Sequence, residues 1–138
     1  MIERDDILAL AKWRMDKANE QLVLAKLALE QMKFSEVLVK SYYAVFHAEQ
    51  ALNAFIFQET KTHKGTLIAF SKNYIREGLI SNEASGYIAR LRRFRERADY
   101  EDFYVADEKT AKDALEKAES LFQQFKKVYE QRVKDLNI

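Results

Sequence analysis

The chain has 138 residues and a mass of 16.2 kDa, and its 23 basic and 22 acidic side chains leave a net charge of +1. This length supports one hydrophobic core but not two, so we expect a single domain over residues 1–138. The balanced charge excludes a general attraction to nucleic acid. Any affinity of that kind must come from a local basic patch.

Several classes of site are excluded by the residues that the sequence lacks. It contains no cysteine, which rules out disulfides, thiolate catalysis and cysteine-bound metals, and His47 and His63 are its only histidines. We therefore expect no metal site and no cofactor. No run approaches the ~20 apolar residues of a membrane span, and the acidic start is unlike a signal peptide, so we expect a cytoplasmic protein.

The absence of proline and the presence of only three glycines favour long helices. Apolar residues at alternating spacings of three and four predict a helix over about 4–32 and a second over about 35–58. The second pattern is apolar on more than one face. We expect this helix to be the most buried, covered by sister helices or by a partner subunit.

A polar connector follows, and in it Thr62 can cap a short helix that ends at Gly78, with Gly65 in the first turn. Ser81 is the predicted N-cap of a third long helix that ends near residue 98. Residues 100–105 are predicted to form a loop, and Asp107 to cap the last long helix. These elements predict an all-α fold, an up-and-down bundle of four long helices plus a short connector helix.

The most unusual local feature is residues 90–104, where five arginines within eight residues are followed by acidic and aromatic residues. On a helix Arg95 and Asp99 share a face, so the guanidinium, the carboxylate and the Tyr100 phenol can converge on one polar site. That site could hold a phosphate or could be an ion pair that ends the helix. We expect most other arginines to be solvated or paired with acids, and one or two to join Arg95.

The polar connector offers a second candidate site, because His63 and Lys64 stand at the start of the short helix. Such a helix start suits a phosphate, although the same residues also make an ordinary helix N-terminus. His47 lies between apolar neighbours and is more typical of a hydrogen-bonded core histidine. Tyr42 and Tyr43 are adjacent and cannot share a face, so we expect Tyr42 to pack inward.

Three segments, 41–52, 61–65 and 95–100, resemble the HEPN domain family in their order and spacing, and the resemblance extends from about residue 22 to 122. It implies a bundle of four or five helices that usually forms homodimers and pairs with a minimal nucleotidyltransferase encoded nearby. Many HEPN proteins are metal-independent ribonucleases of toxin–antitoxin or defence systems. The resemblance therefore implies RNA or nucleotide chemistry.

The ribonuclease branch of the family carries an arginine followed, after four to six residues, by a histidine. An imidazole can move the 2′-hydroxyl proton, while a guanidinium holds the phosphate as its charge grows. Here no histidine follows His63, and Asp99 and Tyr100 stand near the expected position after Arg95. Neither side chain has an ordinary pKa suited to proton transfer near pH 7.

The resemblance thus implies Arg95, Asp99 and Tyr100 as candidate catalytic residues and His63, Lys64 and Arg95 as candidate nucleotide or phosphate ligands. It also suggests that Tyr104, in the loop after the arginines, is modified by a partner nucleotidyltransferase. Three functions stay open: a binding module for RNA or nucleotide with such a partner, a metal-independent endoribonuclease with its active site at a homodimer interface, and a structural dimer. The missing histidine favours binding over cleavage.

Overall fold

The computed structural model describes residues 3–56 and 60–137, and the regular structure within them is helical throughout. The α-helices are α1 (Arg4–Glu30), α2 (Phe34–Asn53), α3 (His63–Phe70), α4 (Glu83–Tyr100) and α5 (Glu108–Leu136). A 3₁₀ turn, Ala54–Ile56, extends α2, and a π-helical turn, Ser71–Ile75, extends α3. The predicted all-α bundle of four long helices and a short connector helix is confirmed.

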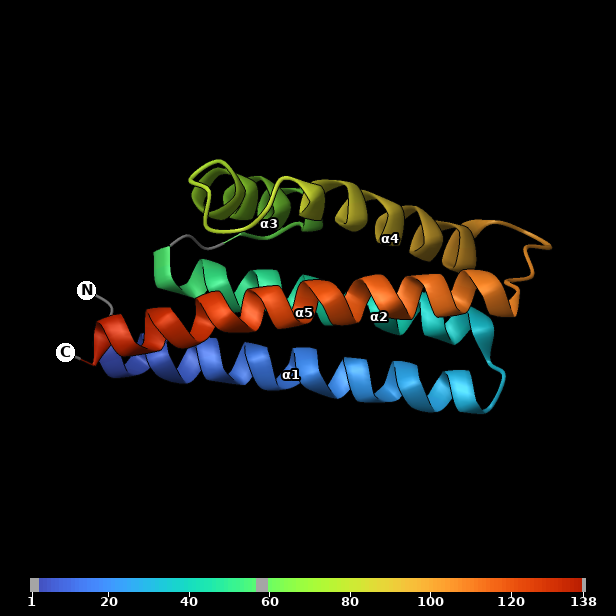
Figure 1. Ribbon diagram of the computed structural model, residues 1–138, viewed down its shortest axis with the longest axis horizontal. Helices are drawn as coiled ribbons and strands as arrows, with labels where there is room; N and C mark the ends of the chain where they lie inside the picture. Colours follow the sequence, from blue (N-terminus) through green and yellow to red (C-terminus); the bar gives the residue numbers. More distant parts are fainter. Residues whose placement is uncertain (1–2, 57–59, 138) are drawn as a thin grey trace.

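The helices form a bundle in which α1, α2 and α5 run side by side, while α3 and α4 lie over the opposite side of α2 (Figure 1). Helix α2 contacts all four other α-helices, so it is the central element, as its apolar pattern predicts. Its apolar surface is covered by the helices of its own chain. That surface is therefore no argument for a partner subunit.

The hydrophobic core draws side chains from all five α-helices. The predicted seam of α1 is buried at Ala11, Met15, Ala18, Leu22 and Ala25. In the centre of the molecule the ring of Phe70 lies 4.8 Å from that of Phe125 and 5.5 Å from that of Tyr74, centroid to centroid. Burial of such apolar surface is the main stabilising contribution to a bundle of this size.

Helix α2 ends earlier than predicted. Its α-helical part stops at Asn53, and of the predicted extension to residue 58 only 54–56 are described, as the 3₁₀ turn. Two tertiary hydrogen bonds act at this end: the Tyr74 hydroxyl donates to the Leu52 carbonyl, and the Asn53 amide donates to the Thr66 carbonyl at 3.0 Å. Contacts with α3 and its extension therefore accompany the change of helix type.

Two of the three N-caps predicted from short polar side chains are confirmed. The Thr62 hydroxyl accepts a hydrogen bond from the Gly65 backbone N–H at 2.9 Å, and a Cβ atom at position 65 would lie only 3.0 Å from that hydroxyl. Asp107 accepts from the Thr110 N–H at 2.8 Å. Gly78 has a φ of +80°, the left-handed conformation that suits glycine after a helix end.

The predicted start of the third long helix is wrong by one residue. Helix α4 has Asn82, not Ser81, as its N-cap, and Asn82 makes no side-chain capping bond. The Ser81 N–H instead donates to the side-chain oxygen of Gln124 on α5 at 2.8 Å. A tertiary contact therefore fixes this turn. The same helix extends to Tyr100, two residues beyond the predicted end.

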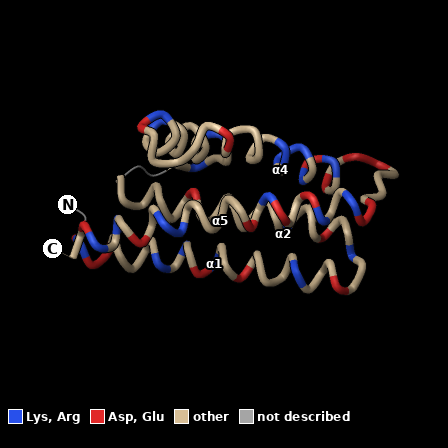
Figure 2. Tube along the Cα trace, viewed as in Figure 1, with Lys and Arg blue, Asp and Glu red and all other residues tan. Residues whose placement is uncertain are grey.

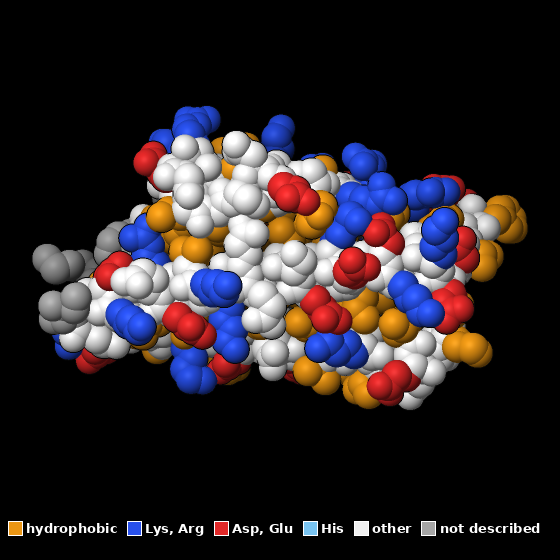
Figure 3. Space-filling view, viewed as in Figure 1, with side chains coloured by type: hydrophobic (Ala, Val, Ile, Leu, Met, Phe, Trp, Pro, Cys, Tyr) orange, Lys and Arg blue, Asp and Glu red, His pale blue; other side chains and the backbone are white. Residues whose placement is uncertain are grey.

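Charged side chains occur along all the long helices, and basic residues gather on the C-terminal half of α4 (Figure 2). The face shown in Figure 3 mixes both signs over α5, with Lys and Arg prominent over α4. Within the described ranges, no helix combines the length and the hydropathy needed to cross a membrane.

Candidate functional site

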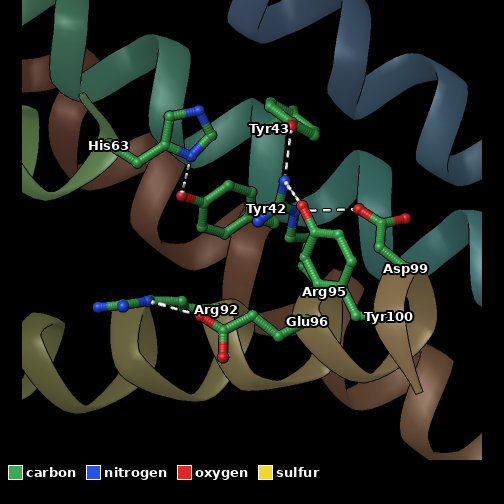
Figure 4. Close-up of polar contacts among 8 residues, drawn as sticks. All are labelled: Tyr42, Tyr43, His63, Arg92, Arg95, Glu96, Asp99 and Tyr100. Carbon is green, nitrogen blue, oxygen red and sulfur yellow. Dashed lines mark hydrogen bonds and ion pairs between the residues drawn. The ribbon is translucent and has the colours of Figure 1, made fainter. Parts of the chain in front are cut away.

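Arg95 is the centre of a cluster of polar and aromatic side chains (Figure 4). Its Nη2 donates to the hydroxyl of Tyr43 at 3.1 Å and to that of Tyr100 at 3.2 Å. Its Nε lies 3.1 Å from the Asp99 carboxylate in an ion pair, and only 15% of its side chain is exposed. The structure thus brings Arg95, Asp99 and Tyr100 together and adds Tyr43 from α2.

Three tyrosine rings surround the Arg95 guanidinium. Its central carbon lies 5.4 Å from the ring centroid of Tyr42, 5.6 Å from that of Tyr43 and 5.2 Å from that of Tyr100. These are cation–π distances, and together with the hydroxyl bonds they fix the side chain in one orientation. A fixed guanidinium loses little conformational entropy when it binds an anion.

The guanidinium nevertheless keeps donors for a ligand. The buried Nε is within ion-pair distance of Asp99 but is not aligned for a hydrogen bond. Among the described residues, no acceptor is found for the hydrogens of Nη1. A guanidinium has five N–H donors, so two bonds from Nη2 to tyrosines leave the N–H groups of Nη1 available to an oxyanion.

His63 lies on the other side of Tyr42, at the first turn of α3 (Figure 4). Its Nδ1 is 2.9 Å from the Tyr42 hydroxyl, and its ring centroid is 4.1 Å from that of Phe46. Burial, and then the positive charges of Arg95 and Arg92, lower the pKa of His63 below its usual value. The imidazole is therefore neutral at pH 7.

These groups line one cavity of about 310 Å³ between α2, α3 and α4. Lys64, Arg92 and Arg95 supply positive charge at its wall, and Glu96 supplies negative charge but is bonded to Arg92 Nε at 2.9 Å. The cavity thus has an excess of cations over anions. Its volume is at the lower end of the range typical of small-molecule sites.

The predicted phosphate ligands His63, Lys64 and Arg95 all line this cavity, although they come from two helices. Of the predicted catalytic residues, some line the cavity and one does not. Tyr100 lines the cavity and is 70% exposed, whereas Asp99 is not part of the lining and contacts Arg95. Asp99 is placed to orient the guanidinium, not to touch a ligand.

Tyr104 is apart from this site. It is half-buried, with its ring centroid 4.4 Å from the guanidinium carbon of Arg97. The exposed aromatic of this loop is Phe103, which has a φ of +63°. His47 is also outside the cavity lining and is 3.2 Å from the side-chain oxygen of Gln50.

The remaining arginines behave as predicted. Arg90 is paired with Asp113 of α5, and Arg97 with Glu101 of its own helix. Arg92 is the additional arginine that joins Arg95 at the cavity. No group of three or more side chains suited to a metal ion is found in the part of the chain that the structure describes.

Sequence reasoning missed Glu49, a carboxyl of α2 that lines the cavity and is only 3% exposed. Burial raises its pKa to about 8. The signal in the sequence was its spacing, because Tyr42, Phe46 and Glu49 follow one another at intervals of four and three and share a helix face. Tyr43 carried no comparable signal, since its role depends on how α2 packs against α4.

The fold and the site together define a small helical bundle with a cavity lined by Arg92 and Arg95. The sequence pattern of the HEPN domain matches residues 11–128, and the chain belongs to that family. A UPF0332 protein of Thermotoga maritima is 28% identical over 130 residues, which cover 94% of this chain and 96% of the relative. A Methanocaldococcus jannaschii protein named "Putative toxin MJ0605" is 30% identical over 118 residues, covering 86% and 79% respectively.

Proposed function

We propose that this HEPN protein binds a phosphate group of RNA or of a nucleotide in the Arg95 cavity. We further propose that it acts in a toxin–antitoxin or defence-type system, as a homodimer with a minimal nucleotidyltransferase as its partner. Membership of the HEPN family and the relative named as a toxin support a toxin-like role, while the homodimer and the nucleotidyltransferase partner are what the family resemblance implies.

The phosphate site is proposed because of the way in which the Arg95 side chain is held. An exposed ion pair four residues apart on a helix contributes only about 0.3–0.5 kcal/mol and needs no enclosure. Arg95 instead is held by two tyrosine hydroxyls and three rings at the wall of a cavity. Such pre-organisation suits recognition of an oxyanion by the guanidinium donors that remain free.

The neighbouring groups suit the same ligand. Lys64 adds a second positive charge, and the neutral His63 can donate from its other ring nitrogen when the Tyr42 hydroxyl donates to Nδ1. Burial first, and then the nearby Glu49, raise the pKa of Tyr42 to about 12, so this phenol keeps its proton. In this tautomer Nδ1 of His63 accepts the hydrogen bond from Tyr42. Nε2–H is then free to donate to a phosphate.

Fluorescence anisotropy with a labelled single-stranded RNA tests the proposed binding. We expect saturable binding that weakens as salt rises, because contacts to phosphate release counterions. Unlabelled nucleoside monophosphate should compete for the cavity. An RNA that shows no change in anisotropy, together with nucleotides that leave the melting temperature unaltered, would contradict the proposal.

A second candidate, a metal-independent endoribonuclease, is favoured by the position of His63 in the Arg95 cavity. If Nδ1–H donates to the Tyr42 oxygen instead, Nε2 can accept the 2′-hydroxyl proton of RNA. The 2′-oxygen then bonds to phosphorus and the bond to the 5′-oxygen breaks, with that oxygen taking a proton from water. The hydroxide so formed takes up the proton held by Nε2 of His63. The products are a 2′,3′-cyclic phosphate and a 5′-hydroxyl end.

Incubation of RNA with the protein in the presence of a chelator separates the two candidates. Cleavage that His63→Gln abolishes and His47→Gln retains would establish the nuclease, because His47 lies outside the cavity lining. Intact RNA beside a cleaved positive control leaves binding as the function.

A further inference from the structure

The cavity holds one polar group that the phosphate site does not use, the carboxyl of Glu49. Glu49 is 3% exposed and lines the cavity, yet it makes no hydrogen bond or ion pair with any residue that the structure describes. Buried carboxyl groups are normally hydrogen-bonded, since an unpartnered one loses its hydration without compensation. A carboxyl in this position therefore indicates a ligand with hydrogen-bond donors.

The register of α2 places the backbone of Glu49 at a different level of the cavity from that of Tyr42. Tyr42, whose ring faces Arg95, and Glu49 are seven residues apart on one helix face, which corresponds to about 10.5 Å along the axis. Glu49 therefore enters the cavity two helical turns away from the residue whose ring faces Arg95. The separation suits the opposite end of a nucleotide, where sugar and base extend away from the phosphate.

We propose that Glu49 recognises the nucleobase of a guanine nucleotide whose phosphate is bound by Arg95. This proposal rests on the proposed phosphate site and assigns the other end of the same cavity. An ionised carboxylate is an acceptor only, with two oxygens side by side. Among the four RNA bases, only guanine presents two adjacent N–H donors, N1–H and N2–H, on its Watson–Crick edge.

The protonation state of Glu49 is compatible with this role. With a pKa of about 8, roughly one Glu49 carboxyl in ten is ionised at pH 7. The free energy needed to ionise the rest lowers the affinity for guanine about tenfold. Two charge-assisted hydrogen bonds from guanine more than offset that factor. Guanine binding should therefore release a proton, whereas binding of an adenine nucleotide should not.

The other titratable groups of the cavity do not mimic this signal at the Glu49 end. They are Tyr42 of α2, His63 and Lys64 of α3, and Arg92, Arg95, Glu96 and Tyr100 of α4. The lowered pKa of His63 leaves it neutral at pH 7, and any change there arises equally with GMP and AMP, which carry the same phosphate. The difference in proton release between GMP and AMP therefore reports on the nucleobase alone.

Calorimetric titration of the full chain with GMP and with AMP at pH 7 tests the inference, in two buffers of different ionisation enthalpy. We expect GMP to bind at least tenfold more tightly and to release about 0.9 proton more than AMP, since that share of Glu49 is protonated. Glu49→Gln should lower GMP affinity at least tenfold and change AMP affinity less than threefold. The exposed Glu36→Gln on the same helix is the matched control and should change neither.

The outcomes separate this inference from the phosphate site. If both nucleotides bind with equal affinity and equal proton release, Glu49 does not read the base, and the phosphate site stands. If neither nucleotide binds, the phosphate site fails and the inference fails with it. If Glu49→Gln does not fold, the difference in proton release measured on the unaltered chain still shows whether Glu49 recognises guanine.

Discussion

At the scale of single residues, the site depends on an arginine that is held firmly and still has donors to offer. The carboxylate of Asp99 and the hydroxyls of Tyr43 and Tyr100 orient the guanidinium from three directions. The Arg95–Asp99 pair could be predicted, because residues four apart on a helix share a face whatever the fold. The contribution of Tyr43 could not, because it depends on the packing of α2 against α4.

Glu49 leads to a stability prediction at the same scale. Its pKa is about 8 in the folded protein and about 4.5 when exposed, so between these values the folded chain keeps a proton that the unfolded chain releases. The free energy of unfolding should therefore fall as pH rises through this window, by up to about 1.4 kcal/mol per pH unit, and level off above pH 8.

Glu49→Gln cannot titrate and should lack this contribution. Urea unfolding at pH 5, 6.5 and 8 should show the variant gaining stability relative to the unaltered chain as pH rises. The contributions of the other ionisable groups cancel in this comparison. Parallel profiles for the two proteins would mean that Glu49 is ionised in the fold and that the origin of its raised pKa, burial without a partner, is wrong.

At the scale of elements, the positions of the helices follow from the spacing of apolar residues. Their ends depend on local capping bonds and on tertiary hydrogen bonds. Thr62 and Asp107 could be predicted as caps because each bonds to a backbone N–H three residues away. Ser81 was predicted wrongly as a cap: α4 begins after Asn82, and the Ser81 N–H donates to the distant side chain of Gln124. The end of α2 was likewise displaced where its last turns bond to residues of the following segment.

The Thr62 cap is the device that positions His63 and Lys64, so its removal should affect both stability and ligand binding. Thr62→Ala loses the bond to the Gly65 N–H and should lower the free energy of unfolding by about 1 kcal/mol. It should also weaken RNA binding by loosening the first turn of α3. Urea denaturation and anisotropy measure the two effects.

The neighbouring Lys61→Ala is the control for this cap, because Lys61 is exposed and does not line the cavity. It should leave the free energy of unfolding within about 0.5 kcal/mol of the original value. Equal losses in the two variants would show that the cap does not stabilise the start of α3.

At the scale of the whole molecule, residues from three helices of the bundle line one cavity. Helix α2 gives Tyr42 and Glu49, α3 gives His63, and α4 gives Arg95. These residues are separated by up to 53 positions in the sequence, so no local pattern could join Glu49 to Arg95. The fold class could be predicted from periodicity, whereas the complete cavity required the packing of the helices.

The proposed homodimer is tested at this scale by sedimentation equilibrium at micromolar concentration. Because α2 is enclosed by its own chain, a second copy has to cover other apolar area, and Trp13, Leu24 and Leu27 of α1 are exposed. We expect a mass twice the 16.2 kDa of the chain. A mass of one chain over the whole concentration range would exclude the dimer.

The central claim, that the Arg95 cavity binds the phosphate of RNA or of a nucleotide, is tested most directly by two arginine variants. Arg95→Gln removes the guanidinium from the cavity, while Arg97→Gln removes the same charge from an exposed position outside the lining. Anisotropy titrations of both with one labelled RNA at one salt concentration compare the two losses. We predict at least a tenfold loss of affinity for Arg95→Gln and less than a threefold loss for Arg97→Gln. Equal losses, or an unchanged affinity for Arg95→Gln, would contradict the claim.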